Sequence, residues 1–596
     1  MPAYRLVRRG GGLSGSVQVG RIRNNELGIM GESKKCKQCD AEFKIEAEDL
    51  EFYKKMSPTF DGKVFNIPTP TLCPDCRRRR RCAWRNMKIV YSRKCDMSKD
   101  SVVSPFAPNS NFKVYKNDIW WSDKWDPLEY GQDFDDSKLF FDQLYDLQLK
   151  VPNMHAFVSN NENSDFCNCT TEAKDSYLVQ SGTKVENCYY SQNISRTKDS
   201  IDCMRTYKSE SCYECALADN SYDCSYLTDS DYCSESYFLD YCTSCKNCFA
   251  CANLRQKQYW IYNKESTKEE FEKVRNEFLS LRGRDRDKKI KEIRDFLKTF
   301  PKKHTHALAN ENFTGDYVYH CKNVKNSFML GYSENITNCF NLENCKDSLD
   351  HDFWGEGSEK VLESEEVGDN AYNIAFCQHC WGSNNLLYCI GLVNNSRNCF
   401  GCVNLKGAEY CIFNKQYTKE EYEKKVAAII EHMKKTGEWG EFFPMKMSYF
   451  AYNESAAYDY FPIDRNTALS LGAKWQDEEF GIKYDGPFYE PEDTKEYVSN
   501  NEKVDEALKG ILKCQATGKP FKLQPGEIAF YIKKKIQIPI YHPDYRYDVR
   551  FKLINPLHLW HRKCMNEGCS NEFETSYSPE RPEKIFCEDC YQKEIK

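Results

Sequence analysis

Residues 212–251 read CYECALADNSYDCSYLTDSDYCSESYFLDYCTSCKNCFAC, and the spacing of their cysteines decides the fold prediction. From Cys188 to Cys251 every cysteine is separated from the next by a multiple of three residues. An α-helix brings residues back to the same face every 3.6 positions, so it would not maintain this spacing. We therefore expect the thiols to lie at equivalent corners of a chain that winds in regular turns.

A finer repeat surrounds these cysteines: a polar residue, then Ser or Cys, then often an aromatic residue. It begins at Asn163, Asp175, Asn187 and Asp199, at a constant interval, and again at Asn326 and Asn338. A fixed short period indicates stacked turns. We predict a parallel β-solenoid with ladders of Asn, Ser and Cys at the turns and aromatic residues inside. Bulky Tyr and Phe in the interior favour turns of about 24 residues over turns of about 12.

The repeat region is duplicated. NCFACANLRQKQYWIYNKESTKEEFEKV from Asn247 aligns with NCFGCVNLKGAEYCIFNKQYTKEEYEKKV from Asn398. Each copy ends in a predicted helix that begins with a capping box, Thr267 with Glu270 in the first and Thr418 with Glu421 in the second.

The run Cys242, Cys245, Cys248 and Cys251 is similar to the ligand run of an iron–sulfur cluster. The last spacing is two residues rather than three, however, no proline follows, and the second copy retains only Cys399 and Cys402. Buried thiols of a ladder are the favoured interpretation, with an additional zinc or an iron–sulfur cluster as alternatives. Cys377-Gln-His379-Cys380 lies in the same phase and is interpreted as structural too.

Both ends of the chain hold cysteine pairs with metal-ligand spacing. The N-terminal quartet is Cys36, Cys39, Cys73 and Cys76, and the C-terminal quartet is Cys564, Cys569, Cys587 and Cys590. Two such pairs complete the tetrahedral shell of four sulfurs that Zn²⁺ prefers, and four protein ligands leave no position open for catalysis. The sequence predicts two structural zinc ions.

The flanks of the two quartets are copies of one module. FKIEAEDLEFYKK from Phe43 matches FKLQPGEIAFYIK from Phe521, and TLCPDCR at 71–77 matches IYHPDYR at 540–546. Each copy offers two metal positions and keeps a different one. At its lost site the N-terminal copy has Cys95, Lys116 and Ile119, and the C-terminal copy has Ile511, Cys514, His542 and Tyr545. Cys514 with His542 is the alternative for a weak metal, but two ligands do not fix a tetrahedral geometry.

These strings carry a resemblance. C-x2-C followed by EDLEFYKK and CPDCR resembles the treble-clef-type zinc-binding domain of bacterial proteins. Nearly the whole chain, including NCFGCVNL, YCIFNKQYTKEEYE and GEWGEFFP, resembles a family of large, cysteine-rich zinc-ribbon proteins of candidate-phyla bacteria. The resemblance implies an architecture, zinc and a cytosolic setting, and it brings no established activity.

The stretch LCPDCRRRRRCAWRN, residues 72–86, predicts a short helix with five consecutive arginines. The C-terminal copy keeps Arg546 and Arg550, which align with Arg77 and Arg81, so that pair is interpreted as structural. Guanidinium groups bind phosphate and an indole stacks on bases, so the remaining residues are candidate nucleic-acid contacts. They are Arg78, Arg79, Arg80, Trp84, Arg85 and Lys88.

The alternative is that these arginines pair with acidic residues of the protein itself. Glu46, Glu48, Asp49 and Glu51 lie in the same module, and the first repeat region is acidic. Residues 31–95 hold 16 Lys and Arg against 9 Asp and Glu, whereas residues 161–255 hold 8 against 15, within a chain of net charge −6. Partners for the basic helix therefore exist inside and outside the chain.

The predicted fold is mainly β, with α/β zinc modules: a duplicated parallel β-solenoid flanked by two small treble-clef or zinc-ribbon domains. The predicted boundaries are a flexible basic tail (1–29), the N-terminal zinc module (30–120), a connector and solenoid cap (121–160), solenoid copy 1 (161–265), a helical linker (266–310), solenoid copy 2 (311–416), a helix and mixed connector (417–510) and the C-terminal zinc module (511–596). The tryptophan-rich segment 120–135 is expected to pack against an open solenoid end.

The predicted function is a non-enzymatic zinc-binding scaffold that contacts nucleic acid or a ribonucleoprotein through the N-terminal module. A scaffold that binds only protein is one alternative. A carbohydrate-active β-helix enzyme using Asp199, Asp202 and Asp223 is the other, although the chain has no P-loop, dinucleotide fingerprint or Gly-x-Ser-x-Gly motif. The 32 cysteines, read as metal-binding or buried thiols, favour a cytoplasmic protein, and no apolar stretch is long enough to predict a membrane span.

Overall fold

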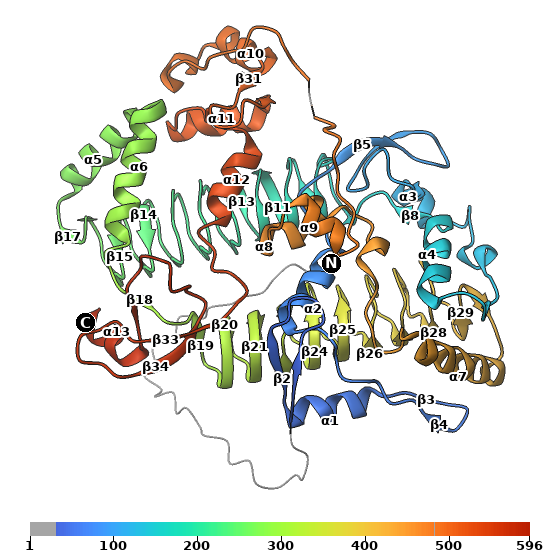
Figure 1. Cartoon of the computed structure of the whole chain (residues 1–596). Coiled ribbons are helices and arrows are strands. Elements are labelled where there is room, and N and C mark those ends of the chain that lie inside the picture. The colour runs from blue at the N-terminus through green and yellow to red at the C-terminus, as the bar shows by residue number, and fades with distance from the viewer. Residues whose placement is uncertain (1–30, 482, 596) are drawn as a thin grey trace.

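The computed structural model describes residues 31–481 and 483–595, so the predicted basic tail lies outside the described residues. The chain is mainly β with some helices, and a group of four cysteines lies near each end. Two long stacks of short parallel strands lie side by side and advance in opposite directions, with helices and two small modules packed around them (Figure 1).

The first stack, here called the first coil, covers residues 158–261. Its strands are β9 (Val158–Ser159), β10 (Asn168–Lys174), β11 (Gln180–Tyr189), β12 (Gln192–Ser195), β13 (Lys198–Ile201), β14 (Tyr237–Asp240), β15 (Phe249–Ala252) and β16 (Trp260–Ile261). Asn168 pairs in parallel with Gln180, and Gln180 pairs in the same way with Gln192. Between β13 and β14 the parallel pairing continues as single bridges between residues that are 12 positions apart, such as Gln192 and Met204.

The second stack, the second coil, covers residues 307–412. Its strands are β19 (Ala307–Leu308), β20 (Glu311–Tyr319), β21 (Lys322–Gly331), β22 (Glu334–Thr337), β23 (Phe340–Glu343), β24 (Lys346–Asp352), β25 (Glu359–Glu365), β26 (Tyr372–Ala375), β27 (Asn384–Leu387), β28 (Arg397–Phe400) and β29 (Cys411–Ile412). Lys322 pairs in parallel with Glu334, and Lys346 pairs with Glu359.

The length of one turn follows from the hydrogen bonds between neighbouring turns. The amide of Cys339 donates to Ser327 Oγ across a separation of 12 residues. Farther along the second coil, the amide of Cys377 donates to Ser364 Oγ across 13 residues. The prediction of turns of about 24 residues was therefore wrong.

The backbone turns a corner at every third residue. Asn187, Tyr190, Asn193 and Arg196 all have φ between 50° and 52°. This left-handed region is uncommon outside glycine, and Asn adopts it more readily than most residues, which explains the frequent Asn and Asp of the repeat. Four such corners complete one turn, so each turn has four short sides.

The residue after each corner points into the coil. Cys188, Ser191, Ile194 and Thr197 are at most 1% exposed. An interior enclosed by such short sides admits only small and medium side chains, so the prediction that aromatic residues fill it was wrong. Tyr213 and Phe249 instead lie in a cluster outside the interior, packed with residues of the surrounding helices.

Hydroxyls and thiols satisfy the backbone inside the coils. The amide of Cys188 donates to Ser176 Oγ at 3.1 Å, and the amide of Cys212 donates to Ser200 Oγ at 3.1 Å. The thiol of Cys242 donates to the carbonyl of Cys251 at 3.5 Å. As predicted, the central cysteines are buried ladder residues, which suits a small, apolar side chain with a weak donor.

Helices flank the coils. They are α4 (Phe140–Lys150), α5 (Lys268–Ser280), α6 (Gly283–Leu297), α7 (Lys419–Thr436), α8 (Ala456–Tyr460), α9 (Arg465–Ser470) and α10 (Asn501–Lys509). The predicted capping boxes of Thr267 and Thr418 are present at the starts of α5 and α7. Among the described residues no helix combines the length and the apolar character needed to cross a bilayer.

The two terminal modules share one order of elements, in agreement with their duplication, except that the N-terminal module has a short hairpin of β3 (Thr59–Phe60) and β4 (Lys63–Val64) between its first two helices. The N-terminal module contains β1 (Glu32–Lys35), β2 (Glu42–Ile45), α1 (Ala47–Met56), α2 (Pro74–Cys82), β5 (Tyr91–Lys94), β6 (Ser101–Ser104), β7 (Val114–Tyr115) and α3 (Asn117–Trp120). The C-terminal module contains β31 (Leu512–Lys513), β32 (Pro520–Phe521), α11 (Pro525–Lys534), α12 (Pro543–Phe551), β33 (Trp560–Lys563), β34 (Glu572–Thr575), β35 (Ile585–Phe586) and α13 (Glu588–Glu594).

The tryptophan-rich segment packs on the last turns of the second coil, as expected for a cap. The ammonium group of Lys406 lies 5.1 Å from the ring centre of Trp120 and 4.7 Å from that of Trp125. Asn414 Nδ2 donates to the carbonyl of Pro127 at 3.1 Å. Both tryptophans are at most 8% exposed, so the coil end is covered rather than left open.

Candidate metal centres and the arginine helix

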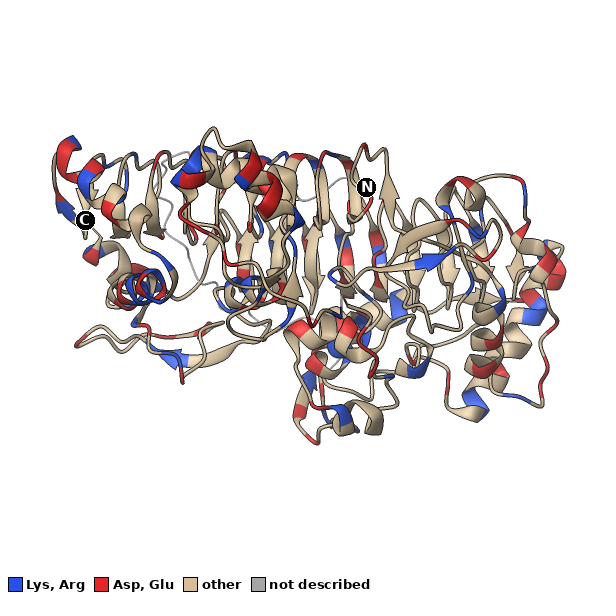
Figure 2. Ribbon diagram, turned by 90° about the horizontal axis from the view of Figure 1, so that it is seen from above, with Lys and Arg blue, Asp and Glu red and all other residues tan. Residues whose placement is uncertain are grey.

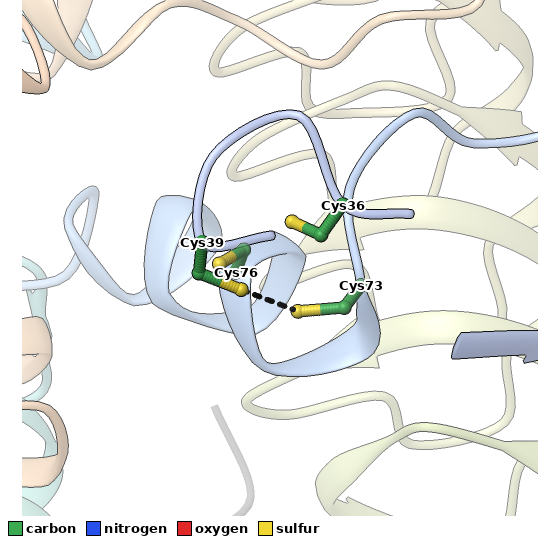
Figure 3. Close-up of side chains that lie close together, drawn as sticks. All are labelled: Cys36, Cys39, Cys73 and Cys76. Atoms are coloured by element: carbon green, nitrogen blue, oxygen red, sulfur yellow. Dashed lines mark hydrogen bonds between the residues drawn. The ribbon is translucent and has the colours of Figure 1, made fainter. Parts of the chain in front are cut away.

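The four N-terminal cysteines converge from two elements. Cys36 and Cys39 lie on the turn that follows β1, Cys73 is the N-cap of α2, and Cys76 lies in its first turn. Figure 3 shows their side chains pointing toward one another. All four Sγ atoms lie within 4.8 Å of one another, and those of Cys39 and Cys73 are 3.6 Å apart.

This geometry fits a tetrahedral zinc ion. Zn–S bonds of about 2.3 Å place neighbouring sulfurs about 3.8 Å apart. A hydrogen bond from Cys76 is the largest cause that lowers the pKa of Cys73, to about 5. The Cys36 thiol also accepts the amide of Gln38 at 3.4 Å, and Arg79 Nη2 lies 3.5 Å from Cys76 Sγ. Donors around the sulfurs are what a thiolate shell needs.

The four sulfurs of the C-terminal quartet also converge and accept hydrogen bonds. Cys569 Sγ and Cys587 Sγ are 3.9 Å apart, and all four sulfurs lie within 4.8 Å of one another. The Cys587 amide donates to Cys564 Sγ at 3.3 Å, and Asn571 Nδ2 donates to Cys587 Sγ at 3.4 Å. Burial alone would raise the pKa of Cys587, but the hydrogen bonds, led by that of Asn571, lower it to about 7.

The two lost metal positions hold single thiols that accept amides. Cys95 accepts from Ser98 at 3.4 Å and from Lys116 at 3.3 Å. Cys514 accepts from Thr517 at 3.4 Å. In the part of the chain that the structure describes, neither cysteine belongs to a group of three or more metal-binding side chains.

Three of the six predicted nucleic-acid residues are buried. Arg78 and Trp84 are fully buried and Arg85 is 3% exposed. Arg78 donates to the carbonyls of Leu557 and Asn326, both at 3.2 Å.

Arg80 and Arg85 are held by glutamates of the second coil. Arg80 lies 2.7 Å from Glu363, and Arg85 pairs with Glu366. Arg79, Arg80 and Lys88 are the members of the predicted set that keep partial exposure.

Arg77 and Arg81 are structural, as the comparison of the two copies predicted. Arg77 Nη2 lies 2.8 Å from Asp350, and Arg81 Nε lies 2.6 Å from Asp352. All four side chains are at most 4% exposed. Arg77 and Arg81 therefore pair with acids of the chain itself, as the alternative interpretation held, but these acids belong to the second coil and not to the acidic first repeat region. Buried charges are tolerated only when paired and hydrogen-bonded in this way.

The C-terminal module repeats the arrangement on the first coil. Arg546 pairs with Asp202, and Arg550 Nη1 lies 2.9 Å from the same carboxylate. Lys534 pairs with Asp223, and Asp199 accepts a hydrogen bond from Asn187 at 3.0 Å. The three aspartates considered for a sugar-cleaving site thus have structural partners.

A buried histidine joins both coils to the C-terminal module. His306 Nδ1 lies 2.9 Å from Asp316 of the second coil, and its Nε2 lies 3.6 Å from Asp229 of the first. Asp316 also accepts from Ser576 of the C-terminal module. Burial alone would lower the pKa of His306, but Asp316 and Asp229 outweigh it and raise the pKa to about 9.

A third group of side chains with potential metal-ligand atoms was not identified from the sequence. Glu365, Glu366 and His379 place one ligand atom each within 4.8 Å of the others. The sequence interpretation placed His379 in the structural cysteine repeat. The available signal was that Glu366 and His379 are separated by one turn of this coil, as are the neighbouring residues Glu365 and Gln378.

No protein-family model matches the chain, and no curated protein matches it. The resemblance to the zinc-ribbon family therefore stays a prediction. Among solved structures, a putative acetyltransferase from Desulfovibrio desulfuricans G20 aligns at 11% identity over 41% of this chain and 65% of that chain, with a TM-score of 0.10. The chain thus spans 65% of the length of that structure, and a TM-score so low does not define a common fold.

Proposed function

We propose that the protein is a non-enzymatic, zinc-stabilised scaffold in which two terminal zinc modules fasten two β-solenoids side by side. One observation carries the proposal. The helix α2 begins at the N-terminal cysteine quartet and, within two turns, inserts arginines into the buried acidic residues of the second coil. Metal binding and docking on the coil therefore act through a single short helix.

The chemistry of α2 supports this role. A helix of 9 residues is marginal on its own, because helix nucleation is costly. Zinc bound by Cys73 and Cys76 would hold its first turn, which sets the direction in which Arg77 and Arg81 project. α12 bears the matching Arg546 on the first coil, and the treble-clef resemblance is consistent with both modules.

Each cysteine quartet is expected to bind one zinc ion. Replacing Cys39 by Ala, or Cys569 by Ala, should each remove one thiolate-bound metal ion from a total of two per chain. Cys39 is exposed and Cys569 is half-buried, so both changes spare the core. The measurement is elemental analysis combined with absorption of the cobalt-substituted protein, because thiolate-bound cobalt gives charge-transfer bands.

Cys95 and Cys514 provide the matched controls, because each is a buried thiol at the corresponding lost position. Cys95→Ala and Cys514→Ala should leave the count of thiolate-bound ions unchanged. A wild-type chain without such bands, or controls that lose an ion, would contradict the assignment.

We propose that the partner of this scaffold is a protein. The arginine run pairs inside the chain, and Lys and Arg are interspersed with Asp and Glu over the molecule (Figure 2). On the first coil, Lys174 lies 3.8 Å from Glu162 and Lys198 lies 3.1 Å from Glu186. Surfaces of mixed sign favour protein contacts over the uniformly charged phosphate backbone.

Binding of single-stranded RNA and DNA to the full chain, measured against salt, separates the two partner classes. We expect no binding that weakens systematically with salt. A fall in log affinity of about 0.7 per phosphate contact for each log unit of salt would restore the nucleic-acid interpretation. Arg79→Ser and Lys88→Ser would then reduce that slope, since these two residues keep partial exposure.

A further inference from the structure

Glu365, Glu366 and His379 lie on two successive turns of the second coil. Glu365 ends β25, and it pairs across the turn with Gln378, so that His379 lies beside Glu366. The glutamates are at most 1% exposed and His379 is 5% exposed. Three groups with strong ligand atoms are thus enclosed in the protein, next to one another.

The side chains of this group lie close together, but several of their polar atoms have no well-aligned hydrogen-bond partner among the described residues. His379 Nε2 lies 2.6 Å from Glu366 Oε2, and Nδ1 lies 3.6 Å from Glu365 Oε2. Among the described residues, neither ring nitrogen has a well-aligned hydrogen-bond partner, and neither does Glu365 Oε1. Phe157 stacks on the imidazole at 4.3 Å between ring centres, which holds the ring in this orientation. Buried carboxylate oxygens and ring nitrogens in such proximity need a compensating cation or proton among them.

The residues around Glu365 and Glu366 donate hydrogen bonds to these carboxylates, as residues around metal ligands do. Gln378 Nε2 donates to Glu365 at 3.1 Å, and Arg85 pairs with Glu366. Carboxylates that bind metals are usually oriented by outer hydrogen bonds of this kind. Arg85 neutralises one of the two carboxylates, so one negative charge is left to attract a cation.

A cavity next to His379 supplies an independent indication. It has a volume of about 20 Å³, enough for one water molecule, and Gln378, His379 and Trp381 are among its lining residues. Gln378 is fully buried, yet its Oε1 has no hydrogen-bond partner within the described part of the chain. A metal-bound water in this cavity would satisfy that oxygen and complete a four-ligand shell.

We propose that Glu365, Glu366 and His379 form a third metal site, which binds one divalent first-row ion through carboxylate and imidazole ligands. Two ligands at about 2.0 to 2.2 Å from one ion are separated by roughly 3 to 4 Å, which is within the spread of this group. Nitrogen and oxygen donors distinguish the site from the two thiolate sites at the chain ends.

The histidine of the other buried His–acid cluster gives the contrast. The Nδ1 of His306 is within hydrogen-bond distance of Asp316 at 2.9 Å, and Tyr317 stacks on its ring. Asp316 accepts a further bond from the His306 amide at 2.6 Å. Those partners satisfy the group without an ion, which makes His306 the matched control.

Manganese is the appropriate probe, because Mn²⁺ favours carboxylate oxygens, whereas thiolates favour softer ions. Mn²⁺ added to the full-length chain and followed by electron paramagnetic resonance should bind at one ion per chain. His379→Gln and the double variant Glu365→Gln, Glu366→Gln should abolish that binding. His306→Gln and Cys39→Ala should leave it at one ion per chain.

Two results would overturn the proposal. The first is a wild-type chain that binds no Mn²⁺, which needs no variant to fold. The second is Mn²⁺ binding that persists at full stoichiometry in His379→Gln. The number of thiolate-bound cobalt ions is measured separately. A negative manganese result would therefore not bear on the assignment of the two cysteine quartets.

Discussion

Removal of zinc from the full-length chain by a strong chelator is expected to unfold the parts of the two terminal modules that contain the cysteine quartets and leave the two coils folded. The modules contain hairpins of short strands and short helices, so the metal supplies much of their stability. Structural zinc contributes about 10 to 16 kcal/mol in small zinc domains near neutral pH. The coils have separate interiors of thiols and aliphatic residues that contain neither cysteine quartet.

Hydrogen exchange read by mass spectrometry distinguishes the parts. Amides of residues 32–82 and 560–594 should lose protection on chelation, whereas amides of β10, β11 and β24 should keep theirs. Protection should return when zinc is restored. Simultaneous loss in modules and coils, or no loss anywhere, would contradict the structural role of the metal.

Substitution of Arg81 by Met is expected to lower the free energy of unfolding by about 3 to 5 kcal/mol. The change leaves Asp350 and Asp352 buried without this partner, and an uncompensated buried charge is among the costliest defects in a protein. Burial already raises the pKa of Asp352, despite the opposing effect of Arg81. Urea unfolding of the full chain measures the change.

Arg465 gives the matched control, because its two contacts with Asp477 at 2.9 and 2.8 Å are exposed. Arg465→Met should cost less than about 1 kcal/mol. Combining Arg81→Met with Asp352→Asn should recover part of the loss, since the carboxylate then needs no partner. Equal costs for the two single variants would show that the arginine cluster is not what fastens α2 to the coil.

The spacing of residues along the chain predicted the repeat well and its size poorly. Cysteines at multiples of three lie at the residue after each corner, where Cys188 and Cys251 are fully buried. The predicted size is wrong because it places Tyr and Phe in the interior of the turn. The corner residues of such a small turn point outward, so Tyr226 and Phe238 stack with each other at 4.4 Å in the cluster outside the interior.

Local chemistry was enough for the cysteine quartets, the duplication of the modules and the capping boxes, because spacing within short segments determines each of them. Cys73 and Cys76 lie on one turn, and Thr267 reaches Glu270 within one helical turn. No distant part of the chain is needed to form these features.

The tertiary structure determines which arginines are buried and which carboxylates they pair with. Arg81 meets Asp352, and Arg85 meets Glu366, although each pair is far apart in the sequence. An arginine is buried when the fold brings carboxylates into contact with it, and it stays available to phosphate when the fold does not. The composition of the chain does not show where those carboxylates lie. His379 meets Glu366 through the stacking of two successive turns of one coil, but Phe157 reaches its ring only when the chain before the first coil packs against the second coil.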